Sequence, residues 1–285
     1  MNERHIAVLI NPRAGKGKLF QTINRLRHKL SDVKILSRFF ADEWPSDLDG
    51  FTDIFLVGGD GTLNFLINKY QSINIPITLF KGGSGNDFAW KLYGKMSFDQ
   101  LWKVAMGGAI IKIDAGICNN MYFINGVGIG FDGQVVHAMG SHKIISAGYF
   151  SYLFTVLREI FFFKEFKMNL KSRIERKSGK IFMISVANGS RYGGGFLVAP
   201  NAIINDAEFD VVIINSMSLF NRMRYLPVAK KGAHLQLPFV DSFRCAALEI
   251  RTEKAIPAHL DGELLVSNLF TINLLPEKYF FRVRQ

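Results

Sequence analysis

Short apolar segments alternate with helical patterns through the first 115 residues of this 285-residue chain, and this alternation constrains the fold more than any other feature. Strand-like runs such as HIAVLIN (5–11) and DIFLVGG (53–59) are each followed by apolar residues at helical spacing. Alternation of this kind is typical of a parallel sheet covered by helices. The sequence therefore predicts an α/β domain over residues 1–115, with ligands at the carboxyl ends of its strands.

The second half of the chain has a different pattern. Its strand-like segments are irregularly spaced, and helical runs interrupt them near residues 146–163 and 218–231. This arrangement predicts a largely antiparallel β domain, a β-sandwich, over residues 116–269. The last strand-like segments could return to either domain.

Three glycine-rich turns follow predicted strands, at residues 11–18 (NPRAGKGK), 58–62 (GGDGT) and 81–87 (KGGSGND). Such turns expose backbone N–H groups, and a helix N-terminus beside them is a natural phosphate site. Thr62 is expected to cap the helix after the second turn. Asp60 would repel a phosphate unless a cation such as Mg²⁺ lies between them. A plain structural turn is the alternative for GGDGT, and NPRAGKGK lacks the spacing of a P-loop.

Two further motifs have competing interpretations. In HLDGELL (259–265), Asp261 and Glu263 could supply a general base and an orienting or metal-binding carboxylate. On pattern alone, an ordinary Asp-Gly hairpin turn is favoured. GIGFDG (128–133) matches G-x-G-x-x-G but lacks the acidic residue that a dinucleotide site needs about 20 residues later, so close backbone packing is expected.

The net charge of +11 suggests an anionic partner, which could be nucleic acid, a phosphorylated ligand or an anionic membrane surface. Residues 149–180 combine many aromatic residues with basic ones. The segment could be a core helix and a strand with a solvated basic face, or a patch that docks on lipid. A binding site for nucleic acid is not expected, because net charge alone would support it.

Other features concern the compartment. The two cysteines, Cys118 and Cys245, do not form a disulfide framework and are expected to be buried in a reducing environment. The first residues do not form a signal peptide, and the longest uncharged stretches of about 14 residues are shorter than the roughly 18 of a spanning helix. The protein is expected to be cytoplasmic, with peripheral membrane association.

Taken in order, the segments INPRAGKGK, LVGGDGTLN, GGSGNDFA, NGVGIGFDGQV and HLDGELL resemble the diacylglycerol kinase catalytic domain family. This family includes bacterial diacylglycerol and YegS-type lipid kinases, sphingosine kinases and ceramide kinases. The resemblance covers essentially the whole chain. It implies a three-layer α/β nucleotide-binding domain related to NAD kinase and phosphofructokinase, and a β-sandwich inserted before a terminal segment, about 270–285, that rejoins the first domain.

The resemblance also implies roles for individual residues. Asp261 matches the proposed catalytic base, with Glu263 beside it. The contacts to ATP would come from the first two turns and one serine of the third: Asn11, Gly58, Gly59, Asp60, Gly61, Thr62, Leu63, Asn64 and Ser84.

Magnesium is expected at two places. One ion would accompany ATP near Asp60. The resemblance implies a second, structural ion held by Asp206 and the carbonyl groups of Ile203 and Glu208. Most relatives have glycine after this aspartate, where the chain has Ala207.

The expected reaction is ATP-dependent phosphorylation of a lipid hydroxyl, first of all conversion of diacylglycerol to phosphatidic acid in phospholipid biosynthesis. The substrate would lie at an anionic membrane surface, to which Arg222, Arg224, Lys230 and Lys231 could contribute. Three alternatives stay open: a kinase of a soluble substrate in the manner of NAD kinase, a kinase of another lipid such as a sphingoid base or phosphatidylglycerol, and a non-catalytic binding protein. The sequence also leaves open whether the chain forms a homodimer.

Overall fold

The chain folds into two compact units. The computed structural model describes residues 4–12, 14, 18–83, 85–141 and 149–285. The first unit comprises Met1–Ile113 and Glu277–Gln285, and the second comprises Asp114–Pro276. Strands β5 (Ala109–Cys118) and β13 (Glu263–Val283) each run from one unit into the other.

The first unit is built on a parallel sheet with the strand order β2-β1-β3-β4. The end of β13 adds a further parallel strand beside β4, where Phe281 pairs with Ile77. All five residues of Asp53–Val57 in β3 are buried, as expected for a central strand covered on both faces. The strands are β1 (His5–Ile10), β2 (Leu36–Phe40), β3 (Asp53–Gly58) and β4 (Ile77–Lys81).

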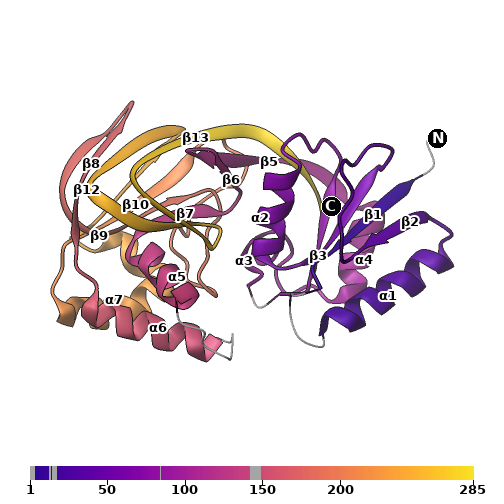
Figure 1. Cartoon of the computed structure of the whole chain (residues 1–285), viewed down its shortest axis with the longest axis horizontal. Coiled ribbons are helices and arrows are strands. Elements are labelled where there is room, and N and C mark those ends of the chain that lie inside the picture. Colours follow the sequence, from indigo (N-terminus) through magenta and orange to yellow (C-terminus); the bar gives the residue numbers. More distant parts are fainter. Residues whose placement is uncertain (1–3, 13, 15–17, 84, 142–148) are drawn as a thin grey trace. The chain divides into compact units, whose positions relative to one another are not determined.

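Helices follow the strands of this sheet in the order that the sequence predicts (Figure 1). From β1 the chain crosses to β2 on one side, and from β3 it crosses to β4 on the other. Right-handed crossovers in opposite directions place the two connecting helices on opposite faces of a sheet, which gives three layers. The helices are α1 (Lys18–Asp32), α2 (Asp60–Lys69), α3 (Asp87–Tyr93) and α4 (Phe98–Gly107).

Polar contacts hold the C-terminal segment in the first unit. The carboxylate of Asp53, only 2% exposed, is bound by Arg4 at 2.6 Å and by Arg282 at 2.7 Å. Burial by itself raises the pKa of Asp53, but the hydrogen bonds and charges of the two arginines outweigh it and lower that pKa. Tyr279, fully buried, donates a hydrogen bond to the carbonyl of Ile67 in α2.

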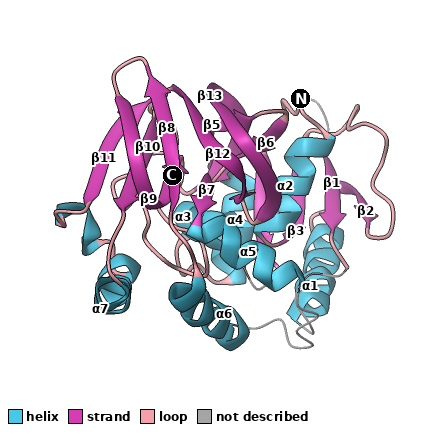
Figure 2. Cartoon of the chain, turned by 60° about the vertical axis from the view of Figure 1, so that its left-hand side comes forward, coloured by secondary structure: helices cyan, strands magenta, loops and turns pink. Residues whose placement is uncertain are grey.

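The second unit is a curved, mainly antiparallel β structure (Figure 2). Its two long strands, β9 and β12, both pair with β7 at one end and with β8 at the other. The core between them is apolar, with Phe123 stacked on Phe209 at 5.5 Å between ring centroids. The strands are β6 (Met121–Phe123), β7 (Gly126–Gly130), β8 (Phe166–Ser172), β9 (Arg176–Ala187), β10 (Phe209–Asn215), β11 (Val240–Cys245) and β12 (Ala247–Leu260).

Three α-helices and a short 3-10 helix accompany these strands: α5 (Phe131–Ser141), α6 (Tyr149–Phe162), α7 (Leu219–Lys230) and η1 (Ala233–Gln236). The two helical runs expected from the sequence are confirmed as α7 and, in its described part, α6. Helix α5 was not predicted, because the glycine-rich segment at its start was interpreted as a site of close backbone packing. The segment MYFINGVGIG was predicted as one strand and is two, β6 and β7, interrupted at Ile124 and Asn125.

Candidate functional site

The three glycine-rich turns meet at the carboxyl ends of three adjacent strands, β1, β3 and β4. The Asn11 side chain donates a hydrogen bond to Thr62 Oγ1 at 3.0 Å, which joins the first turn to the second. The second and third turns touch through backbone, because the Gly82 N–H bonds to the Gly58 carbonyl at 2.9 Å. Asn11 of the first turn thus lies together with the described residues of the second and third turns.

Close backbone packing explains the glycines of these turns. A Cβ atom on Gly59 would lie 2.4 Å from the carbonyl oxygen of Gly85, and one on Gly83 would lie 2.7 Å from the Cα of Gly59. A Cβ on Gly58 would meet the side chain of Thr62 at 2.3 Å. No larger residue fits at these positions without displacing the neighbouring backbone or Thr62.

Asp60 joins the second turn to the third. Its carboxylate accepts the backbone N–H of Asp87 at 2.8 Å and that of Phe88 at 3.1 Å. These are donors of the first turn of α3, so the carboxylate satisfies groups that a helix N-terminus leaves without an intrahelical partner. The structure thus gives Asp60 a structural role, and its assignment to magnesium stays a prediction.

The N-terminus of α2 has a different N-cap residue from the one predicted. The helix begins at Asp60, with Gly59 as N-cap and no side-chain cap. Thr62 was expected to be the cap, and this is wrong: it is buried within the first turn, where its N–H bonds to the Gly59 carbonyl. Leu63 and Asn64 are also buried, and Gly61 is exposed. Ser84 lies outside the described residues.

Asp261 lies in the two-residue turn between β12 and β13, where Leu260 pairs with Glu263. Both turn residues have positive φ, 52° at Asp261 and 97° at Gly262, as the Asp-Gly hairpin predicts. The Asp261 carboxylate accepts three backbone N–H groups at 2.8–2.9 Å, which are contributed by consecutive residues, Ile124, Asn125 and Gly126. Hydrogen bonds of this kind favour the ionised carboxylate and fix its direction. Glu263 is exposed at the start of β13.

At the predicted structural metal site, the Asp206 carboxylate already has a cationic partner, the guanidinium group of Arg244. Arg244 forms ion pairs with Asp206, with Glu208 at 3.2 Å and with Asp210 at 3.9 Å. Ala207 has a φ of 61°, a conformation that favours glycine, and its N–H bonds to Asp114. Because Arg244 already pairs with the Asp206 carboxylate, these contacts do not fit a resident ion.

The other predicted ligands of the structural magnesium ion also lack supporting contacts. Ile203 is half exposed, and no contact of its carbonyl group supports the predicted ligand role. No group of three or more His, Cys, Asp or Glu side chains suited to a metal ion occurs among the residues that the structure describes. The assignment of Ile203, Asp206 and Glu208 to magnesium therefore stays a prediction without a supporting contact.

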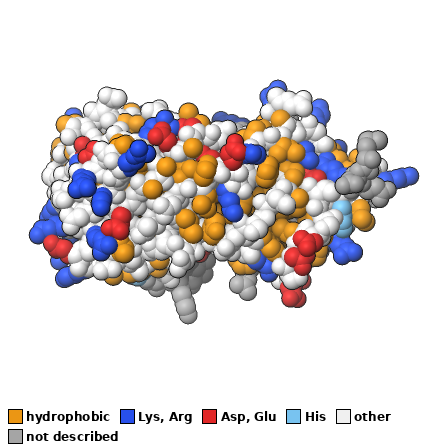
Figure 3. Space-filling model, turned by 90° about the horizontal axis from the view of Figure 1, so that it is seen from above, with side chains coloured by type: hydrophobic (Ala, Val, Ile, Leu, Met, Phe, Trp, Pro, Cys, Tyr) orange, Lys and Arg blue, Asp and Glu red, His pale blue; other side chains and the backbone are white. Residues whose placement is uncertain are grey.

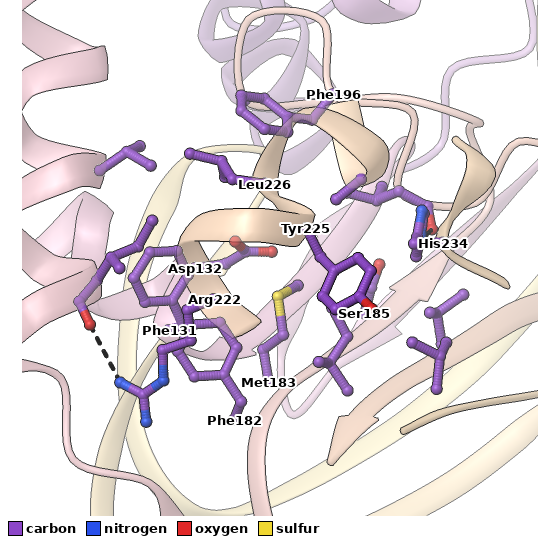
Figure 4. Close-up of a pocket in the computed structure, with 18 of the residues that line it drawn as sticks. Phe131, Asp132, Phe182, Met183, Ser185, Phe196, Arg222, Tyr225, Leu226 and His234 are labelled. Carbon is purple, nitrogen blue, oxygen red and sulfur yellow. Dashed lines mark hydrogen bonds between the residues drawn. The ribbon is translucent and has the colours of Figure 1, made fainter. Parts of the chain in front are cut away.

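An apolar pocket lies in the second unit, under helices α6 and α7 (Figure 4). It encloses about 860 Å³ of empty space, its open mouth included. Most of its wall is aromatic or aliphatic, and the lining includes Phe131, Tyr152, Val156, Phe182, Tyr225 and Leu226.

A polar cluster forms part of the pocket wall, which also contains Ser185, Arg222 and His234. Tyr192 donates a hydrogen bond to Asp132 Oδ2 at 2.7 Å, and its ring contacts that of His259 edge-on. Burial raises the pKa of Asp132 to about 6 despite the hydrogen bond from Tyr192. Burial also lowers the pKa of His259 to about 4, so its ring is neutral at pH 7. In Figure 4 the Asp132 carboxylate projects among apolar side chains.

This polar cluster lies next to the Asp261 turn. His259 precedes Asp261 by two residues, and the Gly262 N–H bonds to its Nδ1 at 3.3 Å. A Cβ on Gly128 would come within 2.5 Å of His259 Nε2 and 3.0 Å of Asp132 Oδ2, so both side chains converge on one glycine. The polar end of the pocket and the candidate base therefore belong to one connected set of contacts.

Sequence reasoning missed Asp132 as a candidate functional residue. Its motif, GIGFDG, was interpreted as close packing, and that interpretation is confirmed. A Cβ on Gly130 would lie 2.2 Å from the Phe166 ring, and one on Gly133 would lie 2.2 Å from the Pro257 carbonyl oxygen. The aspartate between these glycines was the only signal, and nothing local distinguishes it from a helix-start residue.

Comparisons with known proteins identify the family of the chain. Residues 5–118 match the family described as "Diacylglycerol kinase catalytic domain", and residues 125–279 match "YegS C-terminal NAD kinase beta sandwich-like domain". The fold and the two matches define an enzyme of the lipid kinase class, a phosphotransferase. The second match alone covers more than half of the chain, and the chain belongs to the diacylglycerol kinase catalytic domain family in its YegS-type form.

Three individual proteins illustrate the relationship. A protein of Shewanella frigidimarina named "Probable lipid kinase YegS-like" is 26% identical, over 97% of this chain and 93% of its own length. A crystal structure of a diacylglycerol kinase from Bacillus anthracis has a TM-score of 0.74 at 18% identity and covers 99% of this chain and 97% of that one. An NAD kinase from Archaeoglobus fulgidus in complex with ATP has a TM-score of 0.58 at 13% identity, covering 99% and 94%. The two structures show likeness of fold.

Proposed function

We propose that the chain transfers the γ-phosphoryl group of ATP to the hydroxyl group of a membrane lipid, with diacylglycerol as the first candidate and phosphatidic acid as its product. One observation carries this proposal: the second unit contains an apolar pocket whose polar end is connected to the Asp261 turn. The apolar lining of this pocket suits acyl chains, and its polar end suits a hydroxyl-bearing head group. Such a reaction would serve phospholipid biosynthesis.

In the proposed reaction, the lipid hydroxyl oxygen attacks the γ-phosphorus of ATP, the bond from this phosphorus to the β-γ bridging oxygen breaks, and ADP leaves. Asp261 orients the hydroxyl and receives its proton. Its three backbone donors fix the direction of the carboxylate, and positioning of this kind supplies much of the catalysis in phosphoryl transfer. Glu263 lies at the same turn, where its exposed carboxylate can orient the acceptor.

The ATP phosphates are proposed to bind the N-terminus of α2 and the glycine-rich turns around it. The proposed contacts to ATP are Asn11, Gly58 to Asn64 and, from the third turn, Ser84. Support comes from the N-terminus of α2, which has no side-chain cap and is the positive end of the helix dipole. Mg²⁺ is proposed to accompany ATP, where it would neutralise charge on the phosphate oxygens.

The test is a transfer assay with γ-labelled ATP and vesicles that contain diacylglycerol. Asp261→Asn should abolish transfer, because asparagine tolerates positive φ but replaces one carboxylate oxygen with an NH₂ group, so it neither orients the hydroxyl in the same way nor receives its proton. Near-ultraviolet circular dichroism and ATP binding should stay as in wild type. Wild-type turnover in this variant would remove Asp261 from its proposed role.

A panel of acceptors separates the alternatives. We expect phosphorylation of diacylglycerol above that of sphingoid bases, ceramide and phosphatidylglycerol. Phosphorylation of NAD without vesicles would instead favour the soluble-substrate alternative, which the likeness in fold to an NAD kinase keeps open. A protein that binds lipid and ATP without turnover on any acceptor would be a non-catalytic binding protein.

Peripheral association with a cytoplasmic membrane surface is part of the proposal. In the part of the chain that the structure describes, no helix is both long and apolar enough to cross a bilayer. A lipid substrate would then have to be reached from the membrane surface. Homodimer formation stays an open prediction.

A further inference from the structure

The outer faces of helices α6 and α7 carry large exposed apolar side chains. On α6, Phe154 is 68% exposed and Phe162 is 74% exposed, and on α7 Phe220 is 69% exposed. Phe154, Phe161 and Phe162 follow the spacing of one helical face, as do Phe220, Met223 and Arg224. Exposed aromatic residues gathered on adjacent helices mark an interaction surface. We call these outer faces, with their basic residues, the α6–α7 face.

The two helices form one rigid element. Arg222 of α7 donates to the carbonyl groups of Ile160 and Phe163 at 3.1 and 3.0 Å, at the C-terminal end of α6. The same guanidinium pairs with Glu165 at 2.8 Å, and both side chains are nearly buried. Arg222 is therefore a positioning residue that keeps the two helices side by side, as Figures 1 and 2 both show.

The charges on the α6–α7 face have one sign. Arg158, Lys164, Arg224, Lys230 and Lys231 are exposed on or beside the described parts of the two helices. The acidic residues of this region, Glu159 and Glu165, have side chains only 8% and 6% exposed. By contrast, apolar, basic and acidic side chains are intermixed on the surface that Figure 3 shows. The face thus combines apolar and basic groups, which complements an anionic bilayer.

The inner faces of the same helices line the apolar pocket. Tyr152, Val156 and Ile160 of α6 and Tyr225 and Leu226 of α7 belong to its wall. Each helix therefore contacts the pocket with one side and solvent with the other. A lipid that leaves a bilayer beneath these helices would reach the pocket by passing along their edges.

We infer that the α6–α7 face docks the protein on an anionic lipid bilayer, with its phenylalanines in the headgroup region and its basic side chains on the lipid phosphates. The inference rests on the proposed function in one respect: docking would bring the protein to its lipid substrate. Docking itself requires neither ATP nor turnover. It assigns a particular surface to the membrane association, on the two helices that also line the pocket.

The test is co-sedimentation of the full chain with phosphatidylcholine vesicles, with and without phosphatidylglycerol. Wild type should sediment with the anionic vesicles and much less with the neutral ones. The double variant Phe154→Ser/Phe162→Ser should lose roughly tenfold in partitioning for each phenylalanine. Phe20→Ser on α1 is the matched control, because Phe20 is equally exposed at 68%, and it should sediment as wild type does.

Two results would overturn the inference. One is wild-type sedimentation of the double variant, and the other is an equal loss in the Phe20→Ser control. If the double variant instead changes the mass measured by analytical ultracentrifugation without lipid, the face is an interface between two copies. Folding of each variant is checked by its thermal unfolding.

The kinase proposal is tested separately with a short-chain diacylglycerol dispersed as monomers. The double variant should phosphorylate this substrate at the wild-type rate while losing activity on vesicles. If wild type phosphorylates no lipid but still needs the α6–α7 face for sedimentation, docking stands and the proposed function is wrong. If both substrates respond equally to the double variant, the face acts in turnover and the docking inference is wrong.

Discussion

Asp60 accepts the backbone N–H of Asp87 at 2.8 Å, so a residue of the first turn of α2 completes the first turn of α3. This bond links two glycine-rich turns that are 27 residues apart in the chain. The bond explains why the acidic residue Asp60 stands in a turn that is expected to bind phosphate. The carboxylate faces the donors of α3, and its contribution to the architecture does not require a cation.

Asp60→Ala should destabilise the first unit, because two helix N-terminal donors lose their partner. Loss of a capping group costs about 1–2 kcal/mol, which denaturant unfolding can measure. If the role is structural alone, transfer activity should fall by the same factor at every magnesium concentration. A shift in the magnesium concentration for half-maximal activity would instead support the predicted metal contact.

Glu263 and Asp261 differ in their surroundings, which predicts different sensitivities. Glu263→Gln removes an exposed carboxylate and should lower transfer only a few-fold, with unchanged stability. Asp261→Asn removes an acceptor from a set of three backbone N–H bonds and should lower stability as well as activity. Rates and melting temperatures of both variants measure this difference. Equal loss of activity in the two would place both carboxylates in the reaction.

Asp132 and His259 should give the protein two opposing pH dependences. The folded pKa of Asp132, about 6, lies above its ordinary value of 3.8, so its ionisation destabilises the fold as pH rises from about 4 to 6. The folded pKa of His259, about 4, lies below its ordinary value of 6.5, so stability is lost as pH falls from about 6.5 to 4.

Single variants separate these two effects. Asp132→Asn should raise the melting temperature at pH 7 and lose this advantage near pH 4. His259→Asn keeps an acceptor for the Gly262 N–H and should lessen the loss of stability on acidification. Melting temperatures from pH 4 to pH 7.5 measure both slopes, relative to wild type. Parallel curves for wild type and either variant would show that its group does not titrate in this range.

Arg244 predicts that the second unit needs no resident ion. Treatment with EDTA should leave the melting temperature of wild type unchanged. Arg244→Gln leaves Asp206, Glu208 and Asp210 without their shared cation and should lower that temperature, with partial restoration by Mg²⁺. A fall in the wild-type melting temperature on adding EDTA would instead favour the structural ion expected from the sequence.

The local pattern was sufficient for much of the architecture. Alternating strand and helix patterns predicted β1 to α4, because those elements are defined by short-range periodicity and glycine-rich turns. The helical runs expected near residues 146–163 and 218–231 correspond to the described part of α6 and to α7. Helix α5 was missed because its start, FDG, continues a glycine-rich segment and contains no capping signal.

The polar contacts of the site could not be predicted, because they join residues far apart in the chain. Asp261 bonds to Asn125 across 136 residues, and Tyr192 bonds to Asp132 across 60. Periodicity describes which face of an element is buried and carries no information on such partners. The ion pair of Arg244 with Asp206 could not be predicted for the same reason. The two residues lie 38 residues apart and meet only when β10 and β11 pair.

The C-terminal segment has a consequence for how the protein is made. Phe281, Tyr279 and Arg282 complete the core and the buried ion pairs of a unit whose other residues all precede position 114. During synthesis, the ribosome must translate the codon for Arg282 before Asp53 meets its second arginine. The first unit is therefore the last to be completed, and a fragment that ends at residue 113 would leave the ribosome without the strand that closes its sheet.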